Sequence, residues 1–133
     1  MVTKLYEWLN DYQKLIRKID YTEYQLEVSK AELKRWVEGD LQDVKLTKDS
    51  QSSKLESHIN RYENQLKHLI SQRKDLKDFI FKFNDLDSKI LYKKYIEDKS
   101  LEDIAYEVGY SYGHIKRCHA SLVKLIKFVD EDK

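Results

Sequence analysis

The chain contains no proline, and its three glycines lie at positions 39, 109 and 113 of 133 residues. These two residue types are the ones that most strongly end or bend helices, so few positions here force a helix to stop. A sheet protein would need many more turn residues than this chain has. Charged residues make up 37% of the chain, between apolar residues spaced by three and four. The sequence therefore predicts an all-α fold.

Two segments carry a heptad pattern of apolar residues. The second is nearly unbroken and has one polar member, Arg73; its positions are Leu55, Ile59, Tyr62, Leu66, Leu69, Arg73, Leu76, Ile80 and Phe83. The first has two polar members; its positions are Leu5, Leu9, Tyr12, Ile16, Ile19, Glu23, Leu26, Lys30, Leu33 and Val37. A period of about 3.5 residues held this long predicts a left-handed coiled-coil seam.

Between these segments the residues are polar and include the Glu38-Gly39-Asp40 break. We therefore predict an antiparallel helical hairpin within residues 1–83, with arms near 3–38 and 54–83 and a loop near 39–53. Two helices bury little apolar surface alone, so we expect the hairpin to serve interaction or to form a homo-oligomer. Glu23, Lys30 and Arg73 either set the register of such an assembly or lie at the edge of the seam.

The last third of the chain has residues typical of the ends of two short helices joined by a turn. Ser100 and Ser111 are residues that accept hydrogen bonds from the free N–H groups of a following helix. Gly109 lies where a left-handed residue would end the first helix. A preceding helix is expected from about Asp85 to Glu97, with Tyr92 and Tyr95 at its edges.

Apolar stripes define the inner faces of these two helices. Leu101, Ile104, Ala105 and Val108 share the first stripe, and Ile115, Cys118, Leu122, Leu125 and Val129 share the second. A module over residues 84–129 follows, with an acidic tail at 130–133. The helix from about Tyr112 to Phe128 would contribute the outward face.

That outward face is basic. Residues 111–128 contain four Lys or Arg and no Asp or Glu, although the whole chain has a net charge of only +1. Such a face suits a helix in the major groove of DNA. We expect Tyr112, His114, Lys116 and Arg117 to reach base edges. Phosphate contacts are expected from Lys99, Lys124 and Lys127, with Lys93 and Lys94 as further candidates from the preceding helix.

A family resemblance rests on the residues of this module. They are Leu86, Ile90, Leu91 and Tyr95, then Ser100, Leu101, Ile104 and Ala105, then Gly109, Ser111, Ile115, Lys116, Arg117 and Ala120. This pattern of about 45 residues resembles region 4 of sigma factors. The layout of the whole chain looks like the small late transcription regulators of Gram-positive temperate phages, the ArpU, RinA and LtrC type.

The resemblance implies promoter binding and activation of a phage late operon together with host RNA polymerase. It places DNA contacts at Tyr112, Gly113, Lys116 and Arg117. Gly113 departs from the larger polar residue often found at its position. The chain also lacks the segments with which sigma factors melt a promoter, which favours an activator over a complete sigma factor.

Chemistry other than binding has no support in the sequence. His114, Cys118 and His119 lack the fourth ligand of a structural zinc site, and no paired carboxylates have an apolar pocket implied around them. We therefore expect no enzyme activity, metal or cofactor. A single cysteine and the absence of a long apolar run predict a protein of a reducing cytoplasm with no membrane segment. The resemblance implies that this is the cytoplasm of a bacterial host.

Two alternatives remain open. The module could be an adaptor that docks on RNA polymerase, or on a protein antagonist, with little affinity for DNA. In favour of this, residues 85–128 contain eight Lys or Arg and seven Asp or Glu. The chain could also be a phage DNA-packaging subunit, since those join helix-turn-helix and oligomerisation segments, although their DNA-binding module commonly comes first.

Overall fold

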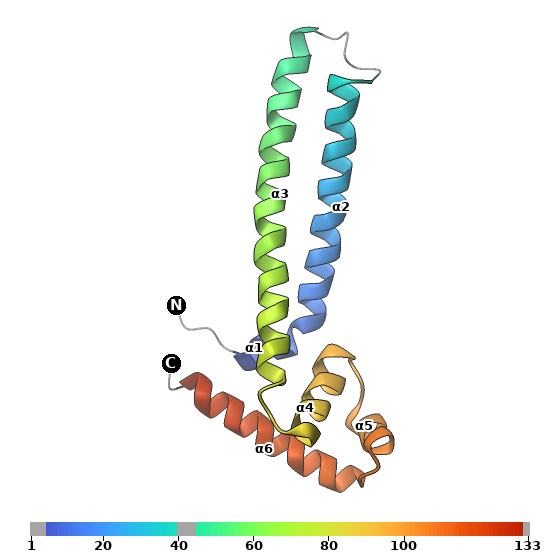
Figure 1. Ribbon diagram of the computed structural model, residues 1–133, viewed down its shortest axis with the longest axis vertical. Coiled ribbons are helices and arrows are strands. Elements are labelled where there is room, and N and C mark those ends of the chain that lie inside the picture. The colour runs from blue at the N-terminus through green and yellow to red at the C-terminus, as the bar shows by residue number, and fades with distance from the viewer. Residues whose placement is uncertain (1–4, 40–44, 132–133) are drawn as a thin grey trace. The chain divides into compact units, whose positions relative to one another are not determined.

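The computed structural model describes residues 5–39 and 45–131, with no side chains described for residues 45–50. This part of the chain is helical and contains no strand, which confirms the predicted all-α class. The elements in chain order are α1 (Leu5–Asn10), α2 (Tyr12–Val37), α3 (Lys45–Ile80), α4 (Asp85–Leu91), the π-helical turn η1 (Tyr92–Ile96), α5 (Leu101–Val108) and α6 (Tyr112–Glu131) (Figure 1). None of these described helices has both the length and the apolar character that crossing a membrane requires.

The contacts divide the chain into two units, which we describe separately. Residues Ile16–Ser71 form the two-helix unit. The described residues up to Leu15 join those from Gln72 onward in the multi-helix unit. The start of the predicted first hairpin arm therefore groups with the C-terminal residues, because α1 packs against α6 and η1.

In the two-helix unit, α2 and α3 run in opposite directions (Figure 1). The inner face of α2 differs in phase from the predicted seam. Thr22 and Ser29 are buried, whereas Glu23 and Lys30 are exposed. A short side chain with a hydroxyl costs less to bury than an unpaired charge, so the helix turns Thr22 and Ser29 inward. Glu23 and Lys30 are thus not members of the seam.

Five positions of the heptad pattern predicted for α3 are buried, namely Leu55, Ile59, Leu69, Leu76 and Ile80, whereas Tyr62, Leu66 and Arg73 are half-buried. The N-terminal boundary of α3 was predicted wrongly, because the helix begins at Lys45 and takes in much of the loop expected near 39–53. The serines and threonine in this stretch cost only a few tenths of a kcal/mol each in a helix, and the segment has no glycine or proline.

The first arm was predicted as one helix and is interrupted at Asp11. The interruption is local, because the Asp11 N–H donates to the Glu7 carbonyl at 2.9 Å and the Leu15 N–H donates to the Asp11 carbonyl at 3.0 Å. Leu9 and Tyr12, on either side of Asp11, are both buried. The backbone thus keeps its hydrogen bonds while it changes direction into α2.

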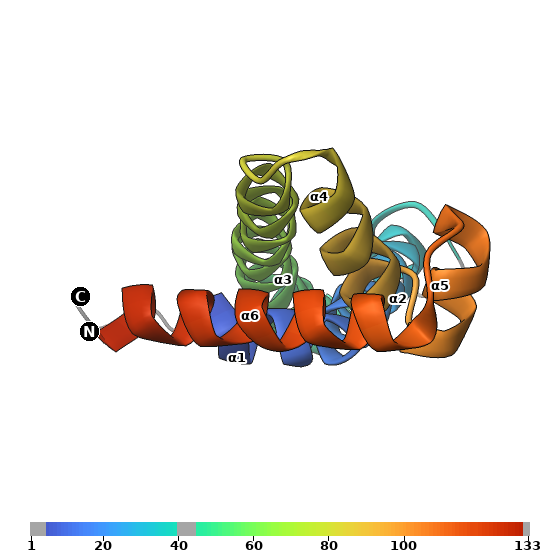
Figure 2. The same cartoon turned by 90° about the horizontal axis from the view of Figure 1, so that it is seen from below.

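The core of the multi-helix unit gathers one or two fully buried apolar side chains from each of α1, α3, α4, α5 and α6. Its fully buried members are Leu9, Leu76, Ile80, Ile90, Leu91, Ile104, Ile115 and Ile126. Tyr95 is also buried, which corrects its expected place at an edge; the π-helical turn η1 directs it inward. In Figure 2, α1 lies along α6, as their contacts require.

The inner stripe of α6 departs from the prediction toward its end. Ile115 and Leu122 are buried as expected, but Ile126 and Asp130 complete the stripe. Leu125 and Val129 are instead 50% and 37% exposed. The prediction continued a 3.5-residue spacing, whereas an α-helix turns every 3.6 residues and carries its inner face on by steps of four.

The predicted acidic tail also needs correction. The helix α6 continues to Glu131, and Asp130 is only 6% exposed. Its carboxylate oxygens accept from the backbone N–H groups of Leu5 and Tyr6, each at 3.0 Å. Asp130 therefore caps the N-terminus of α1, where a negative charge also favours the helix dipole. The last two residues of the predicted tail lie outside the described residues.

Candidate nucleic-acid interface

The starts of α5 and α6 and the turn between them have the hydrogen bonds that the sequence predicts. The Ser100 hydroxyl accepts from the Asp103 N–H at 3.1 Å, and the Ser111 hydroxyl accepts from the His114 N–H at the same distance. Gly109 ends α5 with a φ of 80°, and its N–H donates to the Ala105 carbonyl at 3.0 Å. Each of these bonds joins residues close in sequence, which is why the sequence could predict them.

Packing between α5 and α6 sets the angle at which α6 leaves the turn. Ile104 and Ala105 of α5 and Ile115 of α6 are buried together in this part of the core. The small Ala105 side chain leaves room for the backbones to approach. The first two turns of α6 are thereby held on a rigid support with their other face open.

The open face of α6 brings together most of the predicted DNA-contacting residues. Tyr112, Gly113, Lys116 and Arg117 are all exposed in its first two turns. The Lys116 Nζ lies 5.9 Å from the centre of the Tyr112 ring. At spacings of three and four residues, Lys124 and Lys127 extend the same face. Lys124 is exposed, and the Lys127 Nζ lies 4.7 Å from the centre of the Tyr6 ring in α1.

His114 lies at one edge of that face, beside Arg117. One helical step of roughly 100° turns it toward α4, where Asp87, His114, Arg117 and Cys118 line a shallow groove. Its ring stacks on Tyr110 with centroids 4.9 Å apart, and its Nε2 lies 3.6 Å from the Cys118 Sγ. Among the described residues no group of three or more metal-binding side chains occurs.

Lys99 is also set apart, because its charge is already paired. Its Nζ lies 2.7 Å from the Glu107 carboxylate and 3.5 Å from that of Glu97. Lys93 joins the same cluster, at 3.1 Å from Glu107 and 3.6 Å from Glu97. Hydrogen bonding to Glu107 raises the pKa of Lys99 above its usual range, and the bonds from Lys99 and Lys93 lower the pKa of Glu107.

Behind the interface, a hydrogen bond that the sequence did not predict joins η1 to α6. The Tyr95 hydroxyl lies 2.8 Å from the His119 Nε2. Burial raises the pKa of Tyr95 above its usual range. Burial also lowers the pKa of His119, and the nearby charge of Lys94 lowers it further. Burial therefore favours the neutral imidazole of His119, whose bond to Tyr95 links α6 to η1.

Comparison with known protein families, with curated proteins and with solved structures found no match to this chain.

Proposed function

We propose that the protein is a sequence-specific DNA-binding transcription regulator. The observation that carries the proposal is the exposed face of α6, which has no Asp or Glu over residues 112–128 and begins directly after the Gly109 turn. In this proposal α5 and α6 act as a helix-turn-helix of the sigma region 4 type, and α6 enters the major groove. The two-helix unit acts as a coiled-coil hairpin that pairs copies of the chain.

The residues of the α6 face take separate roles in this proposal. Tyr112, Lys116 and Arg117 meet base edges, since they project from the N-terminal turns. Lys124 and Lys127 hold phosphates further along the helix. One copy has few cations on this face and should therefore bind DNA weakly. Useful affinity for DNA requires two copies, or RNA polymerase as a second binder. Activation of a phage late operon remains part of the proposal through the resemblance alone.

The proposal is tested by incubating the purified protein with fragments of the source genome at two salt concentrations. Selective recovery of a few fragments, with affinity falling as salt rises, is the expected result. Recovery in proportion to fragment length alone would reject sequence-specific recognition.

Gly113→Ala is expected to separate folding from binding. A methyl group at Gly113 meets only the Arg117 guanidinium, at 3.4 Å, so the fold accepts it. Replacing a helical glycine should raise the free energy of unfolding by about 0.5–1 kcal/mol. The same methyl group should weaken selective DNA binding on the order of tenfold, since glycine permits close approach of a backbone to its ligand. Tighter DNA binding in the more stable variant would place Gly113 away from the DNA.

Glu107→Gln is expected to release the two cations that Glu107 now neutralises. Lys99 and Lys93 would then keep only their longer contacts to Glu97, so one positive charge becomes available to phosphates and binding to all DNA should strengthen a few-fold. The slope of log affinity against log salt should steepen by about one. Glu102→Gln removes the same charge from an exposed α5 side chain and serves as the control. An equal gain in both variants would show a general charge effect rather than a release of Lys99 and Lys93.

A second candidate function is supported by the C-terminal half of α6. Leu125 and Phe128 are 50% and 61% exposed; Leu125 lies off the basic face, and Phe128 lies at its edge, one turn after Lys124. Exposed apolar side chains of this size in a charged helix are typical of protein contacts. As an adaptor, the protein would bind RNA polymerase or an antagonist through this surface. Binding of purified polymerase that is lost in Phe128→Ser, with no selective recovery of DNA, would favour this function.

A further inference from the structure

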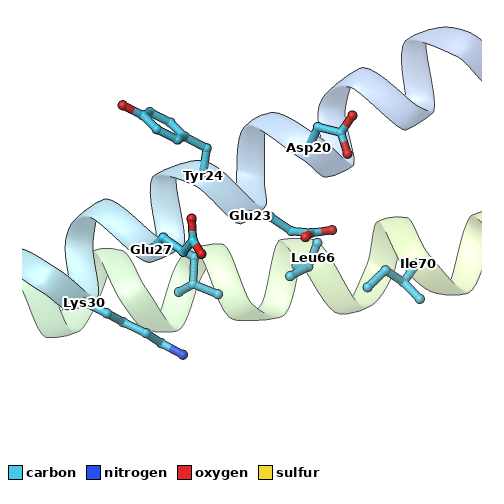
Figure 3. A pocket seen from close by; sticks show the side chains of 8 residues that line it. Asp20, Glu23, Tyr24, Glu27, Lys30, Leu66 and Ile70 are labelled. Carbon is cyan, nitrogen blue, oxygen red and sulfur yellow. The ribbon is translucent and has the colours of Figure 1, made fainter.

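The helix α2 has a second heptad stripe, on the face turned away from its buried residues. Tyr21, Tyr24 and Val28 are 62%, 60% and 43% exposed, and Ala31 continues the stripe. The inner face carries Ile19, Thr22 and Ser29 instead. In Figure 3, Tyr24 projects to the side opposite α3. A helix with an apolar stripe on two sides is typical of assemblies with more than two helices.

Charged residues border this stripe on both sides. Lys18 and Glu32 lie along one edge, and Asp20, Glu27 and Lys34 lie along the other, all exposed. Asp20, Glu23 and Glu27 also form the acidic wall of a groove whose floor includes Leu66 and Ile70 of α3 (Figure 3). Edge charges of this kind set which partner and which orientation a coiled coil accepts.

We propose that this stripe is the dimerisation surface of the protein, and that its partner is the same stripe of a second copy in the antiparallel direction. One register places Tyr24 of each copy against Val28 of the other, and Tyr21 against Ala31. Each large side chain then meets a smaller one, which fills the seam without voids. The proposal deepens the proposed function, because two copies supply the second DNA-binding module.

The same register pairs opposite charges along both edges. Lys18 of one copy meets Glu32 of the other, and Asp20 meets Lys34. By symmetry each of these pairs occurs twice. A parallel arrangement would instead bring Glu27 next to Glu32 and repeat that repulsion on the other side. Charge complementarity therefore selects the antiparallel second copy.

Two kinds of unfavourable contact are built into this arrangement. The register places Arg17 of each copy next to Arg35 of the other. The two copies of Glu27 meet near the symmetry axis, where like charges repel. Neutralising this residue as Glu27→Gln should tighten the dimer several-fold. A dimer that Glu27→Gln weakens would exclude the proposed register.

Charge reversal gives the main test, measured by sedimentation equilibrium of the full chain at low salt without DNA. Lys18 and Glu32 lie about four helical turns apart, too far to pair within one helix. Lys18→Glu and Glu32→Lys alone should therefore each weaken the dimer on the order of tenfold. The double variant K18E/E32K should restore it. An equimolar mixture of the two single variants should pair with each other better than either pairs with itself. Failure of the double variant to recover would overturn the proposal.

Disulfide trapping tests the register independently of affinity. In a Cys118→Ser background, Glu27→Cys should form an intermolecular disulfide on mild oxidation, whereas Glu23→Cys, one turn earlier and away from the symmetry axis, should not. Equal cross-linking at both positions, or a wild-type chain that remains a monomer at about 100 μM, would overturn the proposal. Because these measurements contain no DNA, a monomer that still selects DNA fragments would leave the proposed DNA binding intact.

Discussion

Replacing Lys116 and Arg117 together by alanine is expected to remove selective DNA binding, with a loss on the order of 100-fold in affinity for the preferred fragment. Each good contact to a base edge contributes about 1–3 kcal/mol of discrimination, and 1.4 kcal/mol corresponds to tenfold. The fold should be unaffected, since both side chains are exposed and alanine favours the helix. Fluorescence anisotropy with preferred and scrambled fragments gives both affinities.

The matched control is Lys54→Ala/Lys67→Ala, which removes the same charge from exposed positions of α3. This variant should keep its preference for the selected fragment. If both double variants lose affinity for all fragments equally, the α6 face does not read sequence. Circular dichroism at matched concentration separates a loss of binding from a loss of helix.

Local features of the multi-helix unit were predictable because each depends on neighbours in sequence. Ser100, Gly109 and Ser111 make their hydrogen bonds within four residues, so residue type alone indicated them. The exposed face of α6 followed from the same reasoning once the start of the helix was known. Over the first two turns of α6, the difference between a 3.5- and a 3.6-residue period is too small to change which side chains face outward.

The register of α2 was not predictable from apolar pattern alone. Tyr12, Ile19, Leu26 and Leu33 belong to both possible stripes, and the remaining positions decide between them. One choice adds Leu15, Thr22, Ser29 and Trp36, and the other adds Ile16, Glu23, Lys30 and Val37. The structure takes the first choice, because it keeps two charges in water. The number of apolar residues is the same in both stripes. The cost of burying Glu23 and Lys30 favours the first stripe.

Contacts between side chains of different elements could not be predicted from the sequence. The Lys99–Glu107 pair and the Tyr95–His119 bond depend on how η1, α5 and α6 pack, which no residue pattern states. Both affect the candidate interface, since one neutralises a predicted phosphate contact and the other holds α6 in place. A basic residue in a sequence is therefore a candidate contact only until its neighbours in space are known.

A further contact between distant segments, from Asp130 to the N-terminus of α1, leads to the second large expected effect. Asp130→Ala should lower the free energy of unfolding by about 1–3 kcal/mol, since it removes the acceptor of two backbone N–H groups in a partly buried site. Asp130→Asn keeps the shape of the side chain and one acceptor oxygen, so its loss should be intermediate. Urea unfolding at one fixed protein concentration measures these differences without a contribution from assembly.

Glu131→Ala is the natural control, because it removes the neighbouring carboxylate from an exposed position and should change stability by less than about 0.5 kcal/mol. Equal stability of the Asp130 and Glu131 variants would mean that the cap on α1 does not form in solution. The cap joins α6, which carries the proposed DNA-contacting face, to the segment that leads into α2. Replacing Asp130 should therefore remove the hydrogen bonds between α6 and the N-terminus of α1. The Gly109 turn and the first turns of α6 should keep their own hydrogen bonds.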